Sequence, residues 1–534
     1  MSSFVIFTTP KELAGILPDS NLNQTYFNLA KTTYTKNGVE MDLNVNTLYK
    51  NAGAPHQDPL GENHVLVVPF GFTDSTLTPK QNAETIERIN KTFFGTEEEM
   101  KALGAQTSLA TFYKTSSYGK TEFQGTVLPE WCVYNGTSQQ FYSASGGNLG
   151  PYAAQYARDY YIKEYAKAGH GALGADAKPL SYFDSNNDGY IDLVWIVYSH
   201  PTGTTEDWWA YVTYTGSRPD TTNPTVNTLG FASIDWMSNS CNGYDFHTYT
   251  HETGHTYGLP DYYDYNSTWA PMGGIDFMDH NFGDHNMFSK FSLGWTKPWI
   301  VDDNSIITLR PGTTTGDCFI IPSPGYNGTA FDEYMMFELM APLGLCAEYK
   351  NGYQGTVGYT KPGIRVTHVD SRAYKGSHDT YLADNPEDAI DVRLGNSYGG
   401  RMGIKIDGDY FPVENKSTGK VEKNYMTQLS LIESVINAQN WTNTATYNAS
   451  NDTLFTEGKT FTLSSKKSWA STFMPSRTNL WNKAKTTTGW SNKDTQTYTI
   501  DQTCTFNYTV KVLSINPDPD CGYTATVQIT KDAY

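Results

Sequence analysis

The sequence predicts an α+β domain followed by a β-rich C-terminal region. Strand-like and helical patterns alternate up to residue 300: VLVVPF at 65–70 has the apolar character of a buried strand, and 80–103 has helical spacing interrupted at Gly95. Beyond residue 300, short apolar segments alternate with turn residues, which is typical of antiparallel β-structure. At roughly 100–200 residues per domain, a chain of this length should form several domains.

We expect three regions along the 534 residues. Residues 1–60 have weak periodicity and are interpreted as an N-terminal extension or a propeptide remnant. Residues 61–300 form the α+β domain, and residues 301–534 form one or two β-sandwich-like domains with a break near 440. Within these regions the pattern predicts a helix opened by Pro151 and ended by Gly169. The predicted strands are 193–198, 305–312, 334–341, 363–370, 459–465, 506–515 and 522–530.

Composition excludes some classes of function. The formal net charge of -18 would repel phosphate backbones, and no basic stripe is present, so nucleic acid is not expected as a partner. No apolar run is long enough to span a membrane. The start, MSSFVIFTTPKEL, lacks the features of a signal peptide, whereas the abundance of Tyr, Asn, Thr, Ser and Gly suits an extracellular protein. Either the protein is cytosolic or its signal peptide is not part of this chain, and the composition favours a secreted protein.

The segment THETGHTYGLPDYYD carries the strongest chemical signal. His251 and His255 are four residues apart, so on a helix both imidazoles project from one face and can reach one zinc ion. Glu252 is placed to take a proton from water activated by that metal, without being a ligand itself. The pattern predicts a catalytic zinc site in the α+β domain, which would then be a catalytic domain. His247, one turn earlier, is interpreted as packed or as supporting the ligands.

A catalytic zinc usually has three protein ligands and one open position. Gly258 allows the chain to turn back after the helix because it adopts positive φ without strain, and Pro260 prevents the helix from continuing. The next oxygen ligand is Asp261, which completes the pattern H-E-x-x-H-x-x-G-x-x-D. Asp264 is the alternative third ligand.

These residues resemble the zinc signature of the immune-inhibitor-A-like secreted metallopeptidases. Further segments resemble that family in the same order: YKTSSYGK, SYFDSNNDGYIDLVWIVYSH, FSKFSLGW, MMFELM and KPGIRVTHVD. The resemblance covers roughly residues 60–375. It implies a metzincin-like fold in which Met272, in WAPMGG, packs in a turn beneath the zinc. The chain departs from the family pattern at Thr253, where an aromatic residue is usual.

An acidic loop precedes the predicted strand at 193–198. Asp184, Asn186, Asp188 and Asp192 stand at positions 1, 3, 5 and 9 of a calcium-loop-like run, with Gly189 at position 6. Position 12 is a tryptophan, so the loop is not an EF-hand. We predict a calcium site here, and the alternative is an Asx-rich turn that satisfies only its own backbone.

The function expected from these observations is hydrolysis of peptide bonds in proteins by a secreted zinc endopeptidase. Two alternatives remain at this stage: a non-catalytic adhesin or glycan-binding protein with a vestigial zinc site, and a zinc hydrolase acting on a non-peptide amide. Six cysteines could form up to three disulfides or stay as buried thiols, and Cys504 with Cys521 is the best candidate pair. Oligomeric state cannot be predicted from the sequence.

Overall fold

The chain divides into two compact units. The middle unit is Ala54–Leu259, and the two-segment unit combines Met1–Gly53 with Pro260–Tyr534. The computed structural model describes residues 5–6, 27–53, 57–75, 78–203, 206–263, 272–323, 325–374, 385–389, 391–392, 404–406, 409–410, 412–415, 420–423, 428–432, 434, 449–462, 496–498 and 508–531.

The boundary differs from the predicted division at residues 60 and 300. Strand β13 (Trp299–Ile300) pairs with β2 (Asn28–Leu29) on one side and with β15 (Cys318–Pro322) on the other. The N-terminal segment and the residues just before 300 therefore share a sheet with the C-terminal region. A division of the chain by composition cannot predict main-chain pairing between segments that are far apart in the sequence.

The middle unit is built on one mixed sheet in the order β10-β12-β9-β5-β6, with β7 also paired to β5. All its pairs are parallel except that of the edge strand β10, which is antiparallel to β12. Its elements are β5 (Gly61–Gly71), α2 (Pro79–Phe94), α3 (Glu97–Ala102), α4 (Leu109–Ser116), β6 (Thr121–Val127), β7 (Cys132–Val133), α5 (Ser138–Ser145), α6 (Leu149–Tyr165), η3 (Ala168–Leu173), η4 (Leu180–Phe183), β8 (Tyr190–Ile191), β9 (Leu193–Tyr198), η5 (Glu206–Trp208), β10 (Tyr211–Tyr214), β11 (Thr225–Val226), β12 (Thr228–Ser233), η6 (Ile234–Ser238), η7 (Cys241–Gly243) and α7 (His247–Thr256).

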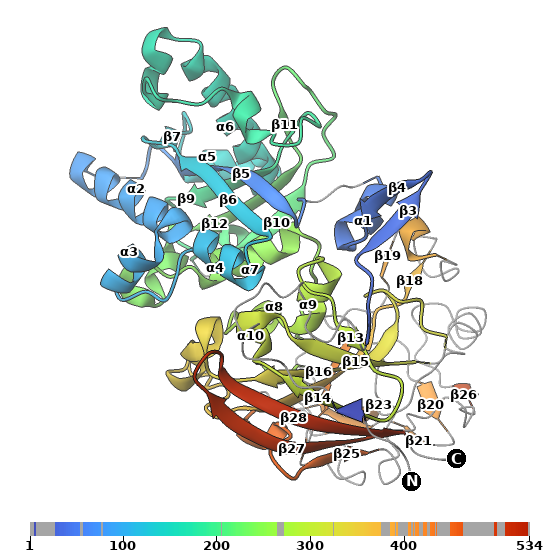
Figure 1. Cartoon of the computed structure of the whole chain (residues 1–534). Helices are drawn as coiled ribbons and strands as arrows, with labels where there is room; N and C mark the ends of the chain where they lie inside the picture. Colours follow the sequence, from blue (N-terminus) through green and yellow to red (C-terminus); the bar gives the residue numbers. More distant parts are fainter. Residues whose placement is uncertain are drawn as a thin grey trace. The chain divides into compact units, whose positions relative to one another are not determined.

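Helices cover both faces of this sheet (Figure 1). Side chains alternate between the faces of a strand, so Val194 and Ile196 of β9 pack in one core with α5 and α6. The intervening Trp195 faces the other way and contacts Phe93 of α2 and Tyr249 of α7. The sheet is thus the layer on which α7 rests. The predicted strand at 193–198 and the helix break at Gly95 are confirmed. The helix predicted from Pro151 to Gly169 is present but begins at Leu149 and ends at Tyr165, so Gly169 does not end it.

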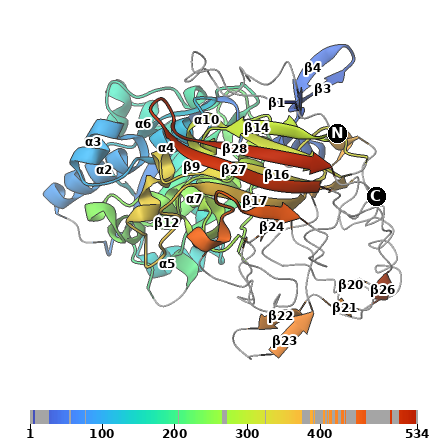
Figure 2. The same ribbon diagram turned by 60° about the horizontal axis from the view of Figure 1, so that its bottom comes forward.

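The two-segment unit contains two larger sheets, in the orders β1-β14-β28-β27-β25 and β2-β13-β15-β16-β17-β24. Buried side chains from both sheets form one core cluster, which is the arrangement of a β-sandwich. Figure 2 shows β14, β28 and β27 side by side. The elements are β1 (Val5–Ile6), β2, β3 (Thr33–Lys36), β4 (Val39–Asp42), α1 (Val45–Asn51), α8 (Phe277–His280), α9 (Met287–Ser292), β13, β14 (Ser305–Leu309), α10 (Gly312–Thr315), β15, β16 (Glu333–Met340), η8 (Gly344–Lys350), β17 (Gly363–Asp370), β18 (Ala373–Tyr374), η9 (Pro386–Asp388), β19 (Asp391–Val392), β20 (Ile404–Ile406), β21 (Asp409–Tyr410), β22 (Pro412–Asn415), β23 (Lys420–Lys423), β24 (Leu429–Ile432), η11 (Asn451–Thr453), β25 (Thr460–Thr462), β26 (Gln496–Tyr498), β27 (Tyr508–Asp518) and β28 (Gly522–Lys531).

The predicted break near residue 440 does not separate two β-domains among these residues. Strand β14 pairs antiparallel with β28, so residues from both sides of position 440 build one sheet. The mixture of helices and sheets agrees with the predicted α+β class. In the part of the chain that the structure describes, no helix is long and apolar enough to cross a membrane.

None of the cysteines that the structure describes is in a disulfide: Cys132, Cys241, Cys318, Cys346 and Cys521. Burial raises the pKa of the Cys132 thiol to about 12. The structure therefore gives no support to disulfides among these five, and Cys504 of the suggested pair lies outside the described residues.

The contact between Gly230 and Trp195 yields a test of how the sheet supports α7. A Cβ atom at Gly230 would lie 2.7 Å from the indole ring. We expect Gly230→Ala to lower the free energy of unfolding by about 1–3 kcal/mol, the usual cost of overpacking. Urea denaturation measures it. Gly71→Ala is the control, since its nearest contacts of 3.5–3.8 Å are ordinary. Equal stability of the two variants would contradict this account.

Candidate metal centre

Helix α7 is connected to the sheet by buried side-chain hydrogen bonds. The indole Nε1 of Trp195 donates to Thr253 Oγ1 over 3.1 Å, and that hydroxyl donates to the carbonyl of Tyr249 at 2.8 Å. The Tyr249 hydroxyl in turn donates to the carbonyl of Ser233 at 2.8 Å, and Tyr113 of α4 donates to the Thr250 carbonyl at 2.7 Å. Thr253 therefore faces the sheet and is completely buried. A large aromatic side chain at this position would displace the indole contact.

The opposite face of α7 carries His251, Glu252 and His255. One potential ligand atom from each residue lies within 4.8 Å of the other two. The two imidazole centroids are 4.9 Å apart with their planes at 88°. His251 is buried, whereas Glu252 and His255 are half-buried. The structure thus brings together the two predicted ligands and the predicted base in a group that could hold a metal ion.

The turn that ends α7 determines which nitrogen of His255 can bind a metal. Gly258 has φ +91°, in the left-handed region, as predicted. Its N–H donates to the His255 carbonyl at 2.9 Å, and the N–H of Leu259 donates to the Gly254 carbonyl at 3.2 Å, which together form a Schellman motif. The motif places the Leu259 carbonyl 2.7 Å from Nδ1 of His255.

A carbonyl oxygen only accepts hydrogen bonds, so Nδ1 of His255 must carry the proton and Nε2 keeps a lone pair for a metal. Metal-binding histidines commonly donate their second ring N–H to a carbonyl in this way. Zinc is commonly bound by imidazole nitrogens, and this site offers two imidazoles at helical spacing, one of them held in the ligating tautomer. The residues present therefore fit a zinc ion, although they do not by themselves identify the metal.

The predicted third ligand belongs to another part of the chain. Asp261 is buried, but it falls in the two-segment unit, and the metal-binding group described above is formed by the middle unit alone. The alternative, Asp264, lies outside the described residues. Met272 is almost completely buried in a turn of the two-segment unit. The choice between the two aspartates and the role of Met272 remain predictions.

The acidic loop before β9 is held together by its own backbone. Asp184 accepts hydrogen bonds from the main-chain N–H groups of Asp188 and Gly189, both at 2.9 Å. Asn186 accepts from the N–H of Asp188 at 3.0 Å. Asp192 accepts from the N–H groups of His64 and Ser185, and its burial raises its pKa to about 6. These contacts support the Asx-turn alternative, and calcium binding stays a prediction.

His247 is completely buried at the start of α7, in agreement with its interpretation as a packed residue. Its Nδ1 lies 2.7 Å from Asp245 Oδ1. Burial alone would raise the pKa of Asp245, but the hydrogen bonds from His247 and Ser240 and the adjacent imidazole lower it below its usual value. Sequence reasoning did not single out Asp245 or its neighbour Cys241, because C-x-x-x-D-x-H is not a specific pattern on its own.

Comparisons with known proteins give no match that assigns a function to this chain. No protein-family model matches the chain, and no curated protein is significantly similar to it. The resemblance to the immune-inhibitor-A-like metallopeptidases therefore rests on short motifs.

The Schellman turn yields a first test of this centre. We expect Gly258→Ala to lower zinc affinity by roughly 10–100-fold, because a Cβ at this φ strains the turn that holds the Leu259 carbonyl against His255. Isothermal titration of the metal-free protein with zinc measures the change. The control is Gly146→Ala, at the left-handed C-cap of α5 with φ +60°, where no atom lies within 4 Å of the new methyl. If both variants bound zinc equally well, the turn would have no role in the site.

The third ligand can be assigned by a pair of variants. If Asp261 completes the zinc site, Asp261→Asn will reduce the zinc content of the purified protein and Asp264→Asn will not. Metal analysis by mass spectrometry measures both. The reverse result would assign the ligand to Asp264, and full zinc content in both variants would exclude both aspartates.

Proposed function

We propose that this chain is a secreted zinc-dependent endopeptidase. The observation that carries the proposal is the group formed by His251, Glu252 and His255, in which the Leu259 carbonyl selects Nε2 of His255 for metal binding. The H-E-x-x-H pattern on a helix is otherwise a moderate signal. Here the two imidazoles and the carboxylate lie close enough together to surround one metal ion, as a catalytic H-E-x-x-H site requires.

A zinc ion bound by the two histidines supplies Lewis-acid polarisation of the substrate carbonyl and lowers the pKa of water. Glu252 is adjacent to the ligands and half-buried, so substrate and water can reach it. Its carboxylate accepts a proton from the attacking water and returns that proton to the leaving amine. His255 stays oriented through this cycle by its hydrogen bond to the Leu259 carbonyl.

An extended peptide, rather than another amide, is favoured by the edge strand of the sheet. Strand β10 is the last in the sheet order and has one strand partner, β12, among the described residues. The hydroxyl of Tyr214, at the end of β10, donates to the carbonyl of His255 at 2.8 Å. A peptide that paired with the outer edge of β10 by main-chain hydrogen bonding would therefore lie beside the metal-binding helix. This arrangement supports protein substrates over a small amide or a glycan.

Substitution of the proposed base tests the function. We expect Glu252→Gln to retain zinc and to lower the rate of casein hydrolysis by roughly 10²–10⁴-fold, the usual contribution of a general base. Zinc content is measured in the same preparation, which separates loss of the base from loss of the metal. Glu84→Gln, on the exposed side of α2, is the control and should keep full activity. Casein hydrolysis by Glu252→Gln at the parent rate would refute the mechanism.

A further inference from the structure

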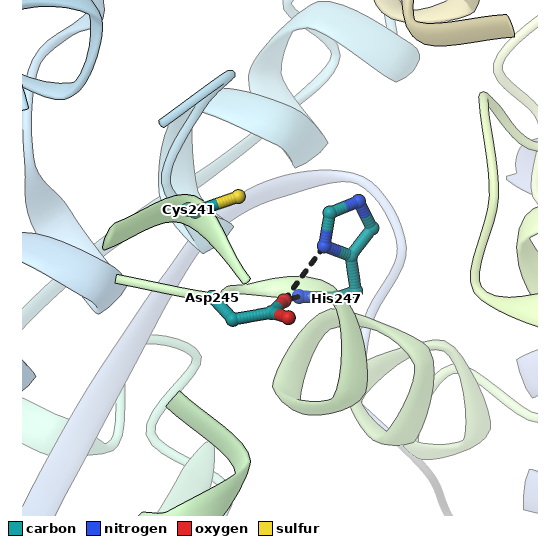
Figure 3. Close-up of side chains that lie close together, drawn as sticks. All are labelled: Cys241, Asp245 and His247. Atoms are coloured by element: carbon teal, nitrogen blue, oxygen red, sulfur yellow. Dashed lines mark hydrogen bonds and ion pairs between the residues drawn. The ribbon is translucent and has the colours of Figure 1, made fainter. Parts of the chain in front are cut away.

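A second group of ligand atoms lies on the segment that leads into α7. Cys241, Asp245 and His247 each offer one atom, and these atoms lie within 4.8 Å of one another. Figure 3 shows the three side chains pointing toward a common region, with the thiol and the imidazole on either side of the carboxylate. The group shares no residue with His251, Glu252 and His255.

The immediate contacts of this group resemble the surroundings of a bound metal. Asp245 Oδ1 lies 2.7 Å from Nδ1 of His247, a hydrogen bond that holds the carboxylate and the imidazole side by side. The hydroxyl of Ser240 lies 2.7 Å from Asp245 Oδ2 and 3.2 Å from the sulfur of Cys241. One hydroxyl thus orients two of the three candidate ligands, which is the usual role of a residue just outside a metal site.

Burial and donor type indicate which ion would fit. Asp245 and His247 are 1% and 0% exposed, whereas Cys241 is half-buried, so an ion would enter from the cysteine side. A thiolate, an imidazole and a carboxylate suit zinc, while calcium and magnesium prefer oxygen ligands alone. A divalent cation would also compensate the buried carboxylate and the thiolate that forms when the thiol proton is released to solvent.

We propose that Cys241, Asp245 and His247 form a second zinc-binding site in the middle unit. The bound ion would connect η7 to the first turn of α7, where Asp245 Oδ1 already accepts a hydrogen bond from the His247 N–H at 3.0 Å. His247 precedes His251 by one helical turn, so the site would stabilise the start of the helix that carries the proposed catalytic ligands. This proposal does not depend on the endopeptidase function.

Cadmium is a suitable probe because a cadmium–thiolate bond has a charge-transfer band in the ultraviolet and a cadmium–imidazole bond does not. Titration of the reduced, metal-free protein with cadmium should produce this band and saturate it at about one equivalent. The band should disappear in Cys241→Ser and persist in His251→Ala and in the control Cys521→Ser, which removes another half-buried thiol. Ser240→Ala should weaken cadmium binding at this site by roughly 10-fold.

A second measurement on the unaltered chain does not depend on how the variants fold. Zinc should protect Cys241 from alkylation by iodoacetamide, while Cys521 reacts equally with and without zinc; peptide mapping by mass spectrometry resolves the two. Absence of the cadmium band, its persistence in a folded Cys241→Ser variant, or alkylation of Cys241 at the same rate with and without zinc would each overturn the proposal. In that case the group is a hydrogen-bonded cluster only.

Discussion

The rotation of α7 about its own axis is determined by the buried hydrogen bonds of its sheet-facing side. Burying a hydroxyl or an indole N–H costs free energy unless the group forms a hydrogen bond. The polar groups of Trp195, Thr253 and Tyr249 all do so, with one another or with main-chain carbonyls. Any rotation of the helix would break several of these contacts at once. Because residues four apart share a face, holding Thr253 against the sheet directs His251 and His255 away from it.

The end of the helix adds a second constraint of a different kind. Only glycine adopts φ +91° without strain, and that conformation lets the chain return so that the Leu259 carbonyl meets His255. The glycine in the motif thus acts on the chemistry through the main chain: it sets a turn, the turn places a carbonyl, and the carbonyl selects a tautomer. At the other end of α7, Asp245 Oδ1 accepts a hydrogen bond from the His247 N–H at 3.0 Å, and the group of Cys241, Asp245 and His247 lies there.

Local patterns predicted the parts of the structure that local interactions determine. The strand Leu193–Tyr198, the helix break at Gly95 and the positive φ of Gly258 follow from apolar runs and glycine stereochemistry, and all three were predicted. The division of the chain was not predicted, because it results from pairing of β13 with β2 across some 270 residues of sequence. The Asx-turn contacts of Asp184 are equally hidden in the sequence, since a calcium loop and a self-satisfied turn use the same residues.

The sequence predicted the side chains of the candidate metal site but not the groups that orient them. Helical spacing identified His251, Glu252 and His255, whereas the supporting groups, the Leu259 carbonyl and the Trp195 indole, come from main chain and from a distant strand.

The central claim is that the two imidazoles bind one zinc ion. Its most direct test is a crystal structure of the protein with anomalous data collected at the zinc absorption edge. The account predicts an anomalous peak about 2.0–2.1 Å from Nε2 of His255 and from one ring nitrogen of His251. Imidazoles that pointed apart in zinc-supplemented crystals, with no anomalous peak between them, would contradict it.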